Sequence, residues 1–435
     1  MKVPCAVGAM LLLIAPLSAL TLSEAYEKAL SNEGRVQTYR YKLKASEEAE
    51  NQAASRLYPA ISASARSGGR RYAPRYVDEV RNELTSSFSA TLVQPLYHPE
   101  YLSEWDSAEF RSQVDGLQYE KEKSALGREV AKAYFEVKRT QAGVALSRSY
   151  LQANEAKYEQ IEKTFSFGMS SKVDLLEAKV NLDDARIQQL RDRKHLEVAH
   201  IYLARLINEE VTALPDEELD ALEIESLGRD GYEAWKRRVK NNIDLRLAAY
   251  DKSIADLTLQ DARYGHYPKV DVRLFFSKTD STDIYTYRDD TRAEIEVNIP
   301  IFQGGYVQSR IKEAQWRCLA ADQEIAQYRR IADLMFEETW EQFLASKEHA
   351  TVLREAVESA ELYMHSIEKS HQKGLKSLFD LYDAKTRLFK VRHNLLDTLY
   401  EVVIAYINLL DVTGELTLDR IVQLDALFFK ETVAE

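Results

Sequence analysis

The sequence predicts a mostly helical protein made of two structural repeats, each of which adds two β-strands and one long helical hairpin. The main observation is an internal repeat: residues 168–179 and 374–385 share the skeleton G-x-x-S-x-x-D-L-x-x-A-K. Each copy lies between long proline-free stretches with helical character. Ahead of each hairpin, two stretches have strand character, mostly with alternating apolar and polar residues, as in a sheet with one wet face. One object built twice therefore explains the chain better than several unrelated domains.

The repeated stretch has the residues that the tip of a helical hairpin requires. Gly168 and Gly374 relieve the backbone at each bend, and the serine three positions later can cap the returning helix. We therefore predict hairpin-tip turns at these two glycines.

The first 19 residues have the pattern of a secretory signal peptide. Lys2 precedes an apolar stretch that is short for a membrane span, and small residues lie near Ala19. No later stretch approaches the ~20 apolar residues of a transmembrane helix, so we expect any membrane insertion to use strands. After cleavage Cys318 is the only cysteine, which excludes an intrachain disulfide and favours a small buried side chain on a helix. A formal charge of −12 makes the chain a poor nucleic-acid binder.

The first repeat, residues 20–227, begins with a predicted helix over 22–57, which Pro59 ends. Two strands follow, a weak serine-rich one over 61–66 and a clear alternating one over 84–92. The Gly-, Arg- and Tyr-rich residues 67–82 between them predict an exposed loop.

The hairpin of the first repeat has no proline between residues 100 and 214. A helix from 99 to 164 would be about 90 Å long at 1.5 Å per residue. Residues 172–207 form the predicted returning helix, and the acidic, proline-containing residues 209–227 are interpreted as an insertion.

The second repeat, residues 228–416, has the same order, and residues 417–435 form a C-terminal segment. Its predicted elements are a helix, a strand, a polar loop, a second strand and a hairpin, at residues 232–263, 270–276, 277–291, 293–299 and 306–413.

Four strands are too few to close a membrane barrel, because the smallest ones use about eight. An open sheet in lipid would leave polar backbone unpaired. The sheet is therefore either covered by helices in a soluble protein or shared between several chains. Apolar residues on one face and charged residues on the other favour a shared barrel with an aqueous lumen. Four aromatic residues lie where a predicted strand meets a helix: Tyr58, Tyr97, Tyr267 and Phe302. In a barrel they would form one aromatic girdle at the membrane interface, and in a soluble sheet they would pack between helix and sheet.

Residues 299–315, IPIFQGGYVQSRIKEAQ, resemble the TolC-type outer-membrane channels, in which a strand enters P-[IL]-[FY]-x-G-G and a helix leaves it. The opening LTLSEA at 20–25, the two hairpin tips and the closing LLDVTGEL at 409–416 also resemble that family. For Gly304 and Gly305 a tight strand–helix turn with positive φ is a simpler explanation than an anion-binding nest.

The resemblance implies a homotrimer in the outer membrane of a Gram-negative bacterium, with a 12-stranded β-barrel continuous with an α-helical tunnel through the periplasm. Residues 209–227 and the C-terminal segment would form a belt around the tunnel. The protein would be a passive exit duct for drugs, small toxic compounds or, in type I secretion, proteins. Its implied partners are a periplasmic adaptor (membrane fusion) protein, an inner-membrane pump of RND, ABC or MFS type, and outer-membrane lipid.

The resemblance also implies a channel constriction at Asp380 and Asp383, which are three residues apart and so share one face of a helix. Six such carboxylates in a trimer would raise one another's pKa, bind cations and pass cations more readily than anions. The alternative is that both are solvated acids favoured by the helix dipole. The first repeat has Asp174 and Glu177 at the matching positions.

In the family, the aspartate that matches Asp174 holds the tip closed through polar links to a tyrosine and an arginine. This chain has His371 and Lys376 at those two positions. Lys376 keeps the charge but loses the bidentate geometry of arginine, and His371 would make a gate pH-sensitive near neutrality. The gate network therefore departs from the family pattern here.

The sequence shows no enzyme motif: H-E-x-x-H, G-x-S-x-G, P-loop and paired-cysteine patterns are all absent. We expect no catalytic residue, metal or cofactor. The alternative to a channel is an exported coiled-coil structural protein or adhesin, which explains the helices but not the alternating strands in both repeats.

Overall fold

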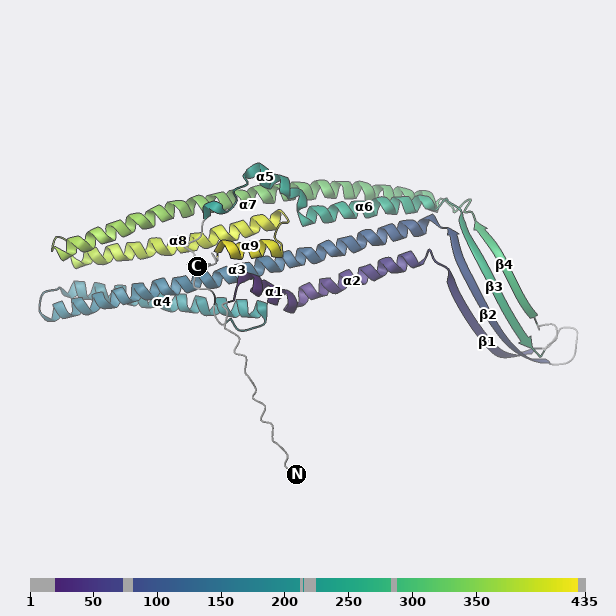
Figure 1. Ribbon diagram of the computed structural model, residues 1–435, viewed down its shortest axis with the longest axis horizontal. Coiled ribbons are helices and arrows are strands. Elements are labelled where there is room, and N and C mark those ends of the chain that lie inside the picture. The colour runs from purple at the N-terminus through teal and green to yellow at the C-terminus, as the bar shows by residue number, and fades with distance from the viewer. Residues whose placement is uncertain (1–19, 73–80, 212–213, 215–223, 283–287, 429–435) are drawn as a thin grey trace, which may run out of the picture.

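The computed structural model describes residues 20–72, 81–211, 214, 224–282 and 288–428, so the predicted signal peptide lies outside the described residues. The molecule is elongated: long helices run along it, a sheet forms one end and two hairpin tips form the other (Figure 1). The prediction of a mostly helical chain with four antiparallel strands is confirmed for the described residues.

The elements of the two halves follow the same order. The first half contains α1 (Leu22–Asn32), α2 (Gly34–Ser55), β1 (Ala60–Tyr72), β2 (Arg81–Tyr97), α3 (Pro99–Ser166) and α4 (Lys172–Ile207). The second contains α5 (Tyr232–Arg238), α6 (Ile243–Tyr264), β3 (Lys269–Ser281), β4 (Arg288–Asn298), α7 (Tyr306–Gln372), α8 (Leu378–Val412) and α9 (Leu418–Phe428). Short 3₁₀ helices lie at Ile224–Ser226 and Val239–Asn241.

Two predicted helices are each broken in the structure. The helix predicted over 22–57 is interrupted at Glu33, whose backbone is extended and whose side chain caps α2. The helix predicted over 232–263 is interrupted at Asn242, whose side-chain oxygen accepts hydrogen bonds from the first turn of α6. In both places a polar side chain satisfies free backbone N–H groups and starts a new helix.

The strands are longer than predicted, so both predicted loops are partly wrong. Residues 67–72 belong to β1, and residues 81–82 belong to β2, while 73–80 lie outside the described residues. In the second half β3 extends to Ser281, and β4 starts at Arg288. Cross-strand pairing explains the extension of β1, because Ser67 Oγ lies 2.9 Å from Ser86 Oγ on β2.

The four strands form one antiparallel sheet in the order β1-β2-β3-β4. One face is apolar and solvent-exposed, with Ile61 and Ile295 each more than 70% exposed. The other carries charges, including the Arg273–Glu296 ion pair at 2.8 Å between Nη2 and Oε2. Within one chain, β1 and β4 are both edge strands.

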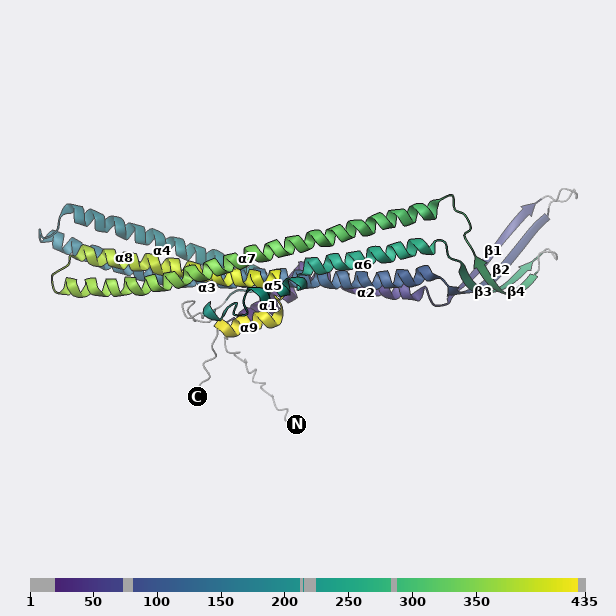
Figure 2. The ribbon, with the colours of Figure 1, turned by 90° about the horizontal axis from the view of Figure 1, so that it is seen from above.

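The long helices form a single curved layer rather than a closed bundle. Near the sheet the neighbours are α2, α3, α6 and α7 in that order, and near the tips they are α4, α3, α8 and α7 (Figures 1 and 2). The core lies near the middle, where α1 and α9 cover the long helices. Among the described residues, no helix has both the length and the apolar content to cross a membrane.

The end of α8 depends on Gly414, which has φ of +68°. A Cβ there would lie 2.4 Å from the backbone oxygen of Asn241. Gly414→Ala is therefore expected to lower the free energy of unfolding by about 2–5 kcal/mol through strain and overlap. The measurement is chemical denaturation followed by circular dichroism at fixed protein concentration.

A matched control for this variant is Gly168→Ala. Gly168 has nearly the same φ, +72°, but open space where the Cβ would stand. It should lose only the strain contribution, about 1–2 kcal/mol. Equal losses in the two variants would show that the contact with Asn241 is unimportant.

Candidate constriction at the hairpin tips

The two hairpin tips have the same local geometry. Gly168 and Gly374 both have φ of +72°, and each donates a backbone hydrogen bond to the helix that precedes it. The returning helix then begins with a reciprocal cap, in which a serine and an aspartate satisfy each other's backbone N–H groups: Ser171 with Asp174, and Ser377 with Asp380. The shared sequence skeleton therefore describes a turn and a helix start.

Asp380 is held by its own cap. Its Oδ2 accepts hydrogen bonds from the Ser377 backbone N at 2.9 Å and from Ser377 Oγ at 2.8 Å. Lys376 Nζ lies 3.6 Å from the other carboxylate oxygen. The hydrogen bonds from Ser377 lower the pKa of Asp380, with a smaller contribution from Lys376.

Asp383 has a different partner one turn further along α8. Its Oδ2 accepts a hydrogen bond from Arg387 Nε at 2.9 Å. The sequence interpretation missed Arg387, although its i,i+4 spacing from Asp383 is the usual signal for such a pair. Both Asp380 and Asp383 are partly exposed on the first turns of α8. A ring of carboxylates requires neighbouring chains, so the constriction stays a prediction.

The predicted gate residues fall into two groups within one chain. In the second tip, His371 Nδ1 lies 2.9 Å from the backbone oxygen of Lys376, which in turn pairs with Asp380. In the first tip, Asp174 is bound by Ser171. Among the described residues, Asp174 makes no hydrogen bond or ion pair with His371 or Lys376 of the same protomer.

Sequence reasoning also missed Lys157 of α3. Its Nζ lies 5.5 Å from the ring centroid of Phe379 and 4.9 Å from that of Tyr382, both on α8. Burial lowers the pKa of Lys157. The negative charge of Glu177, which was predicted as part of the tip network, opposes this with a smaller effect. No sequence pattern joins residues so far apart in the chain.

The aromatic residues predicted at the membrane interface all lie between the sheet and the helices. The exposed fractions are 68% for Tyr58, 43% for Tyr97, 45% for Tyr267 and 83% for Phe302. Much of each ring surface therefore remains available for other contacts, and the girdle stays a prediction. Gly304 and Gly305 have φ of +62° and +84° in a tight turn ahead of α7.

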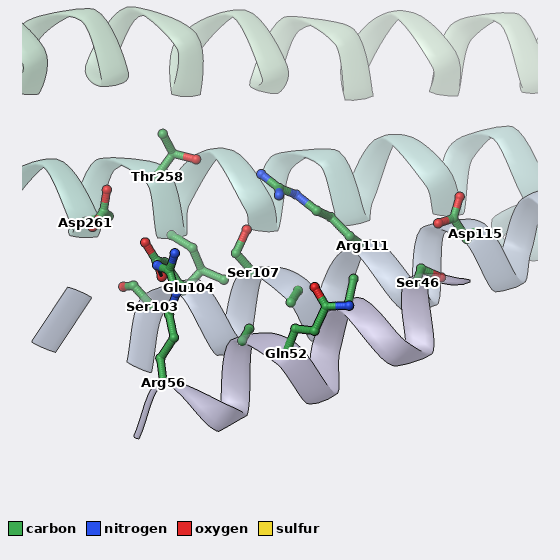
Figure 3. A pocket seen from close by; sticks show the side chains of 14 residues that line it. Ser46, Gln52, Arg56, Ser103, Glu104, Ser107, Arg111, Asp115, Thr258 and Asp261 are labelled. Atoms are coloured by element: carbon green, nitrogen blue, oxygen red, sulfur yellow. Dashed lines mark hydrogen bonds and ion pairs between the residues drawn. The ribbon is translucent and has the colours of Figure 1, made fainter. Parts of the chain in front are cut away.

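A pocket of about 690 Å³ lies nearer the sheet, between α2, α3 and α6 (Figure 3). Its walls combine small side chains with charged pairs such as Arg56 with Glu104. None of the predicted site residues lines it. The tips therefore hold the candidate site, and the pocket lies elsewhere.

Several solved outer-membrane channels share this fold of a four-stranded antiparallel sheet continuous with two long helical hairpins. The solved open-state MtrE outer membrane channel of Neisseria gonorrhoeae has it, with a TM-score of 0.75 at 16% identity, covering 91% of this chain and 90% of that one. The family model described as outer membrane efflux protein matches residues 25–209 and 236–415. The chain belongs to this outer membrane efflux protein family.

Named relatives agree with the family. The outer membrane protein TolC of Escherichia coli is 25% identical over 359 residues, covering 77% of this chain and 70% of the relative. The TolC of Vibrio cholerae is 23% identical over 421 residues, covering 94% of both. The chain is therefore an outer-membrane protein of the efflux channel class, whose relatives are channels rather than enzymes.

Proposed function

We propose that three copies of this chain assemble into one closed exit duct, which conducts solutes passively from the periplasm through the outer membrane. The observation that carries this proposal is that, within the described residues, both the sheet and the helical layer have two edges without a neighbour in the same chain. The sheet ends in β1 and β4, and the helical layer ends in α7 on one side and α2 and α4 on the other. A head-to-tail ring would pair each edge with its opposite in the next copy.

The outer face of α4 supports closure by neighbours. It carries an exposed apolar stripe at helical spacing that faces no helix of its own chain: Val173, Leu176, Val180, Ile187, Leu190 and Ile201. Residues three, four and seven apart form one face of a helix, which is the pattern of a coiled-coil seam. On the opposite edge, α7 exposes Leu334, Met335 and Leu362. Three such seams would close the tunnel.

The sheet is compatible with three copies and an aqueous lumen. Three chains would supply twelve strands, above the minimum of about eight, and would leave no edge unpaired in lipid. The apolar face would contact lipid, and the face with Arg273 and Glu296 would line the lumen. The exposed junction aromatics would lie at the membrane interface.

The proposed duct has no energy source of its own, so it requires partners. We assign the driving force to an inner-membrane pump of RND, ABC or MFS type and the connection to a periplasmic adaptor protein. Relatives from Pseudomonas putida that are described as outer membrane proteins of antibiotic, toluene and solvent efflux pumps support drugs and small toxic compounds as cargo. We propose secreted proteins as a second class. We assign the chain no catalytic reaction and no cofactor.

The test is to purify the detergent-extracted protein, measure its mass by light scattering and record its conductance in a planar bilayer. A trimer that gives discrete, cation-selective conductance steps is the expected result. A folded oligomer without pores would favour a structural spacer or adhesin, and a stable monomer would contradict the edge-closure argument.

A further inference from the structure

Lys157 is an unusual residue for its position. It lies on α3 near the first tip and is 4% exposed, although lysine is rarely buried without a paired charge. Within the described ranges, no carboxylate oxygen comes within ion-pair distance of its Nζ. Burial lowers its pKa, while the charges of Glu177 and Asp383 oppose this at longer range. Burial of its ammonium group without a paired charge therefore destabilises the fold, which suggests that the group has a function at this position.

The partners of the ammonium group are two aromatic rings of the other hairpin. Phe379 and Tyr382 lie on the first two turns of α8, with ring centroids 5.5 Å and 4.9 Å from Lys157 Nζ. Such cation–π contacts hold a cation over a ring face. Among the described residues, no other ring or polar contact between α3 and α8 lies nearer the tips. Further along the same seam, Tyr150 stacks on Phe389 at 4.2 Å.

The same two turns of α8 carry the proposed constriction. Each residue advances about 100° around a helix. Asp380 and Asp383 each follow one of the two aromatic residues directly in the sequence, so the carboxylate pair lies about 100° around α8 from the aromatic pair. Any rotation of these turns about the helix axis moves both pairs together. A contact that fixes the rings therefore also fixes the carboxylates.

We propose that Lys157 is a positioning residue for the constriction: its ammonium group fixes the rotation of the first turns of α8 and so sets where Asp380 and Asp383 point. This inference rests on the proposed function, because it gives Lys157 a role in aiming the carboxylate pair. The contact joins the two hairpins of one protomer, so it acts in every copy of the assembly.

The test compares three variants of the full-length oligomer. Lys157→Met keeps an unbranched side chain but removes the charge, and Lys157→Arg keeps a cation for the rings. Lys385→Met is the matched control, because Lys385 lies over the same Tyr382 ring at 5.7 Å but belongs to α8 and joins no hairpins. Each variant is measured by hydrogen exchange and by ion selectivity in a planar bilayer.

Lys157→Met is expected to raise amide exchange in the first two turns of α8 by about 2- to 30-fold, the range that corresponds to losing a cation–π contact. The thermal midpoint should not fall, because removing a buried charge offsets the lost contact. Cation selectivity should fall towards that of Asp380→Asn/Asp383→Asn. Lys157→Arg and Lys385→Met should both resemble the unmodified protein.

Unchanged exchange and selectivity in Lys157→Met would overturn the proposal. So would a lower thermal midpoint with faster exchange throughout α3 and α8, since that is general destabilisation. If the double asparagine variant itself leaves selectivity unchanged, the constriction is wrong. The exchange measurement then still decides whether Lys157 holds α8.

Discussion

Replacing Asp380 and Asp383 together by asparagine is expected to reduce the cation preference of the pore several-fold and to weaken its block by divalent cations. The physical reason is that a trimer would lose six carboxylates from its narrowest point, and such rings set the charge selectivity of pores. Asparagine keeps a side-chain oxygen that can accept the Ser377 backbone hydrogen bond. The measurement is the reversal potential under a salt gradient in a planar bilayer.

The control for the asparagine variant is Glu355→Gln/Glu358→Gln. These two acids are exposed, three residues apart and on α7, away from the tips. Neutralising them should change selectivity much less. Equal changes in both double variants would mean that selectivity comes from the general acidity of the chain, and the constriction would be lost from the proposal.

The pH dependence of the constriction follows from the cap of Asp380. The hydrogen bonds from Ser377 lower its pKa below the ordinary value of 3.8, so its charge persists at pH values where a free aspartate is already protonated. The stability that this cap adds is likewise present above the unfolded pKa and is lost as pH falls through the folded pKa. Because the six carboxylates of a trimer would raise one another's pKa, the cap offsets part of that rise, and cation preference should decline only in the acidic range in which aspartates take up protons.

The tips could be predicted from the sequence because all their determinants are local. A glycine with positive φ, a serine cap and an aspartate three residues later lie within one short stretch. The breaks at Glu33 and Asn242 were missed because helical residues continue on both sides of each capping residue. Local signals thus predict a helix start reliably where a glycine turn precedes the cap, and less reliably where the cap lies inside a continuous helical pattern.

The parts that could not be predicted depend on distant residues. Gly68 and Gly69 have loop-like composition, but they lie in β1 because β2 provides their backbone partners. Lys157 gave no signal because the rings that surround it belong to the other repeat. Closure of the carboxylate ring depends on other copies of the chain, and no pattern within one chain can place them.

The apolar stripe on α4 predicts that assembly of the chain can be disrupted by two substitutions. Ile187→Glu/Leu190→Glu is expected to convert the proposed trimer into monomers. These side chains are 54% and 57% exposed in one chain, so the change should leave the fold of the protomer intact. Burying the exposed half of each side chain in a seam would contribute about 0.8–1.5 kcal/mol, and a buried unpaired glutamate would reverse that contribution. Light scattering of the detergent-extracted protein measures the mass, and circular dichroism checks its helix content.

Arg193→Glu/His195→Glu is the matched control, because both residues are exposed on the same helix but off the stripe. It makes the helix more acidic to a comparable extent without placing acids in the proposed seam, so the trimer should persist. If both double variants become monomers, repulsion between acidic chains explains the loss and the stripe is not specific. If Ile187→Glu/Leu190→Glu remains a trimer, the α4 stripe is not required for assembly, and the paired edges of the sheet are sufficient to hold the copies together. Only the loss of assembly in the first variant alone identifies the α4 stripe as the seam between neighbouring copies.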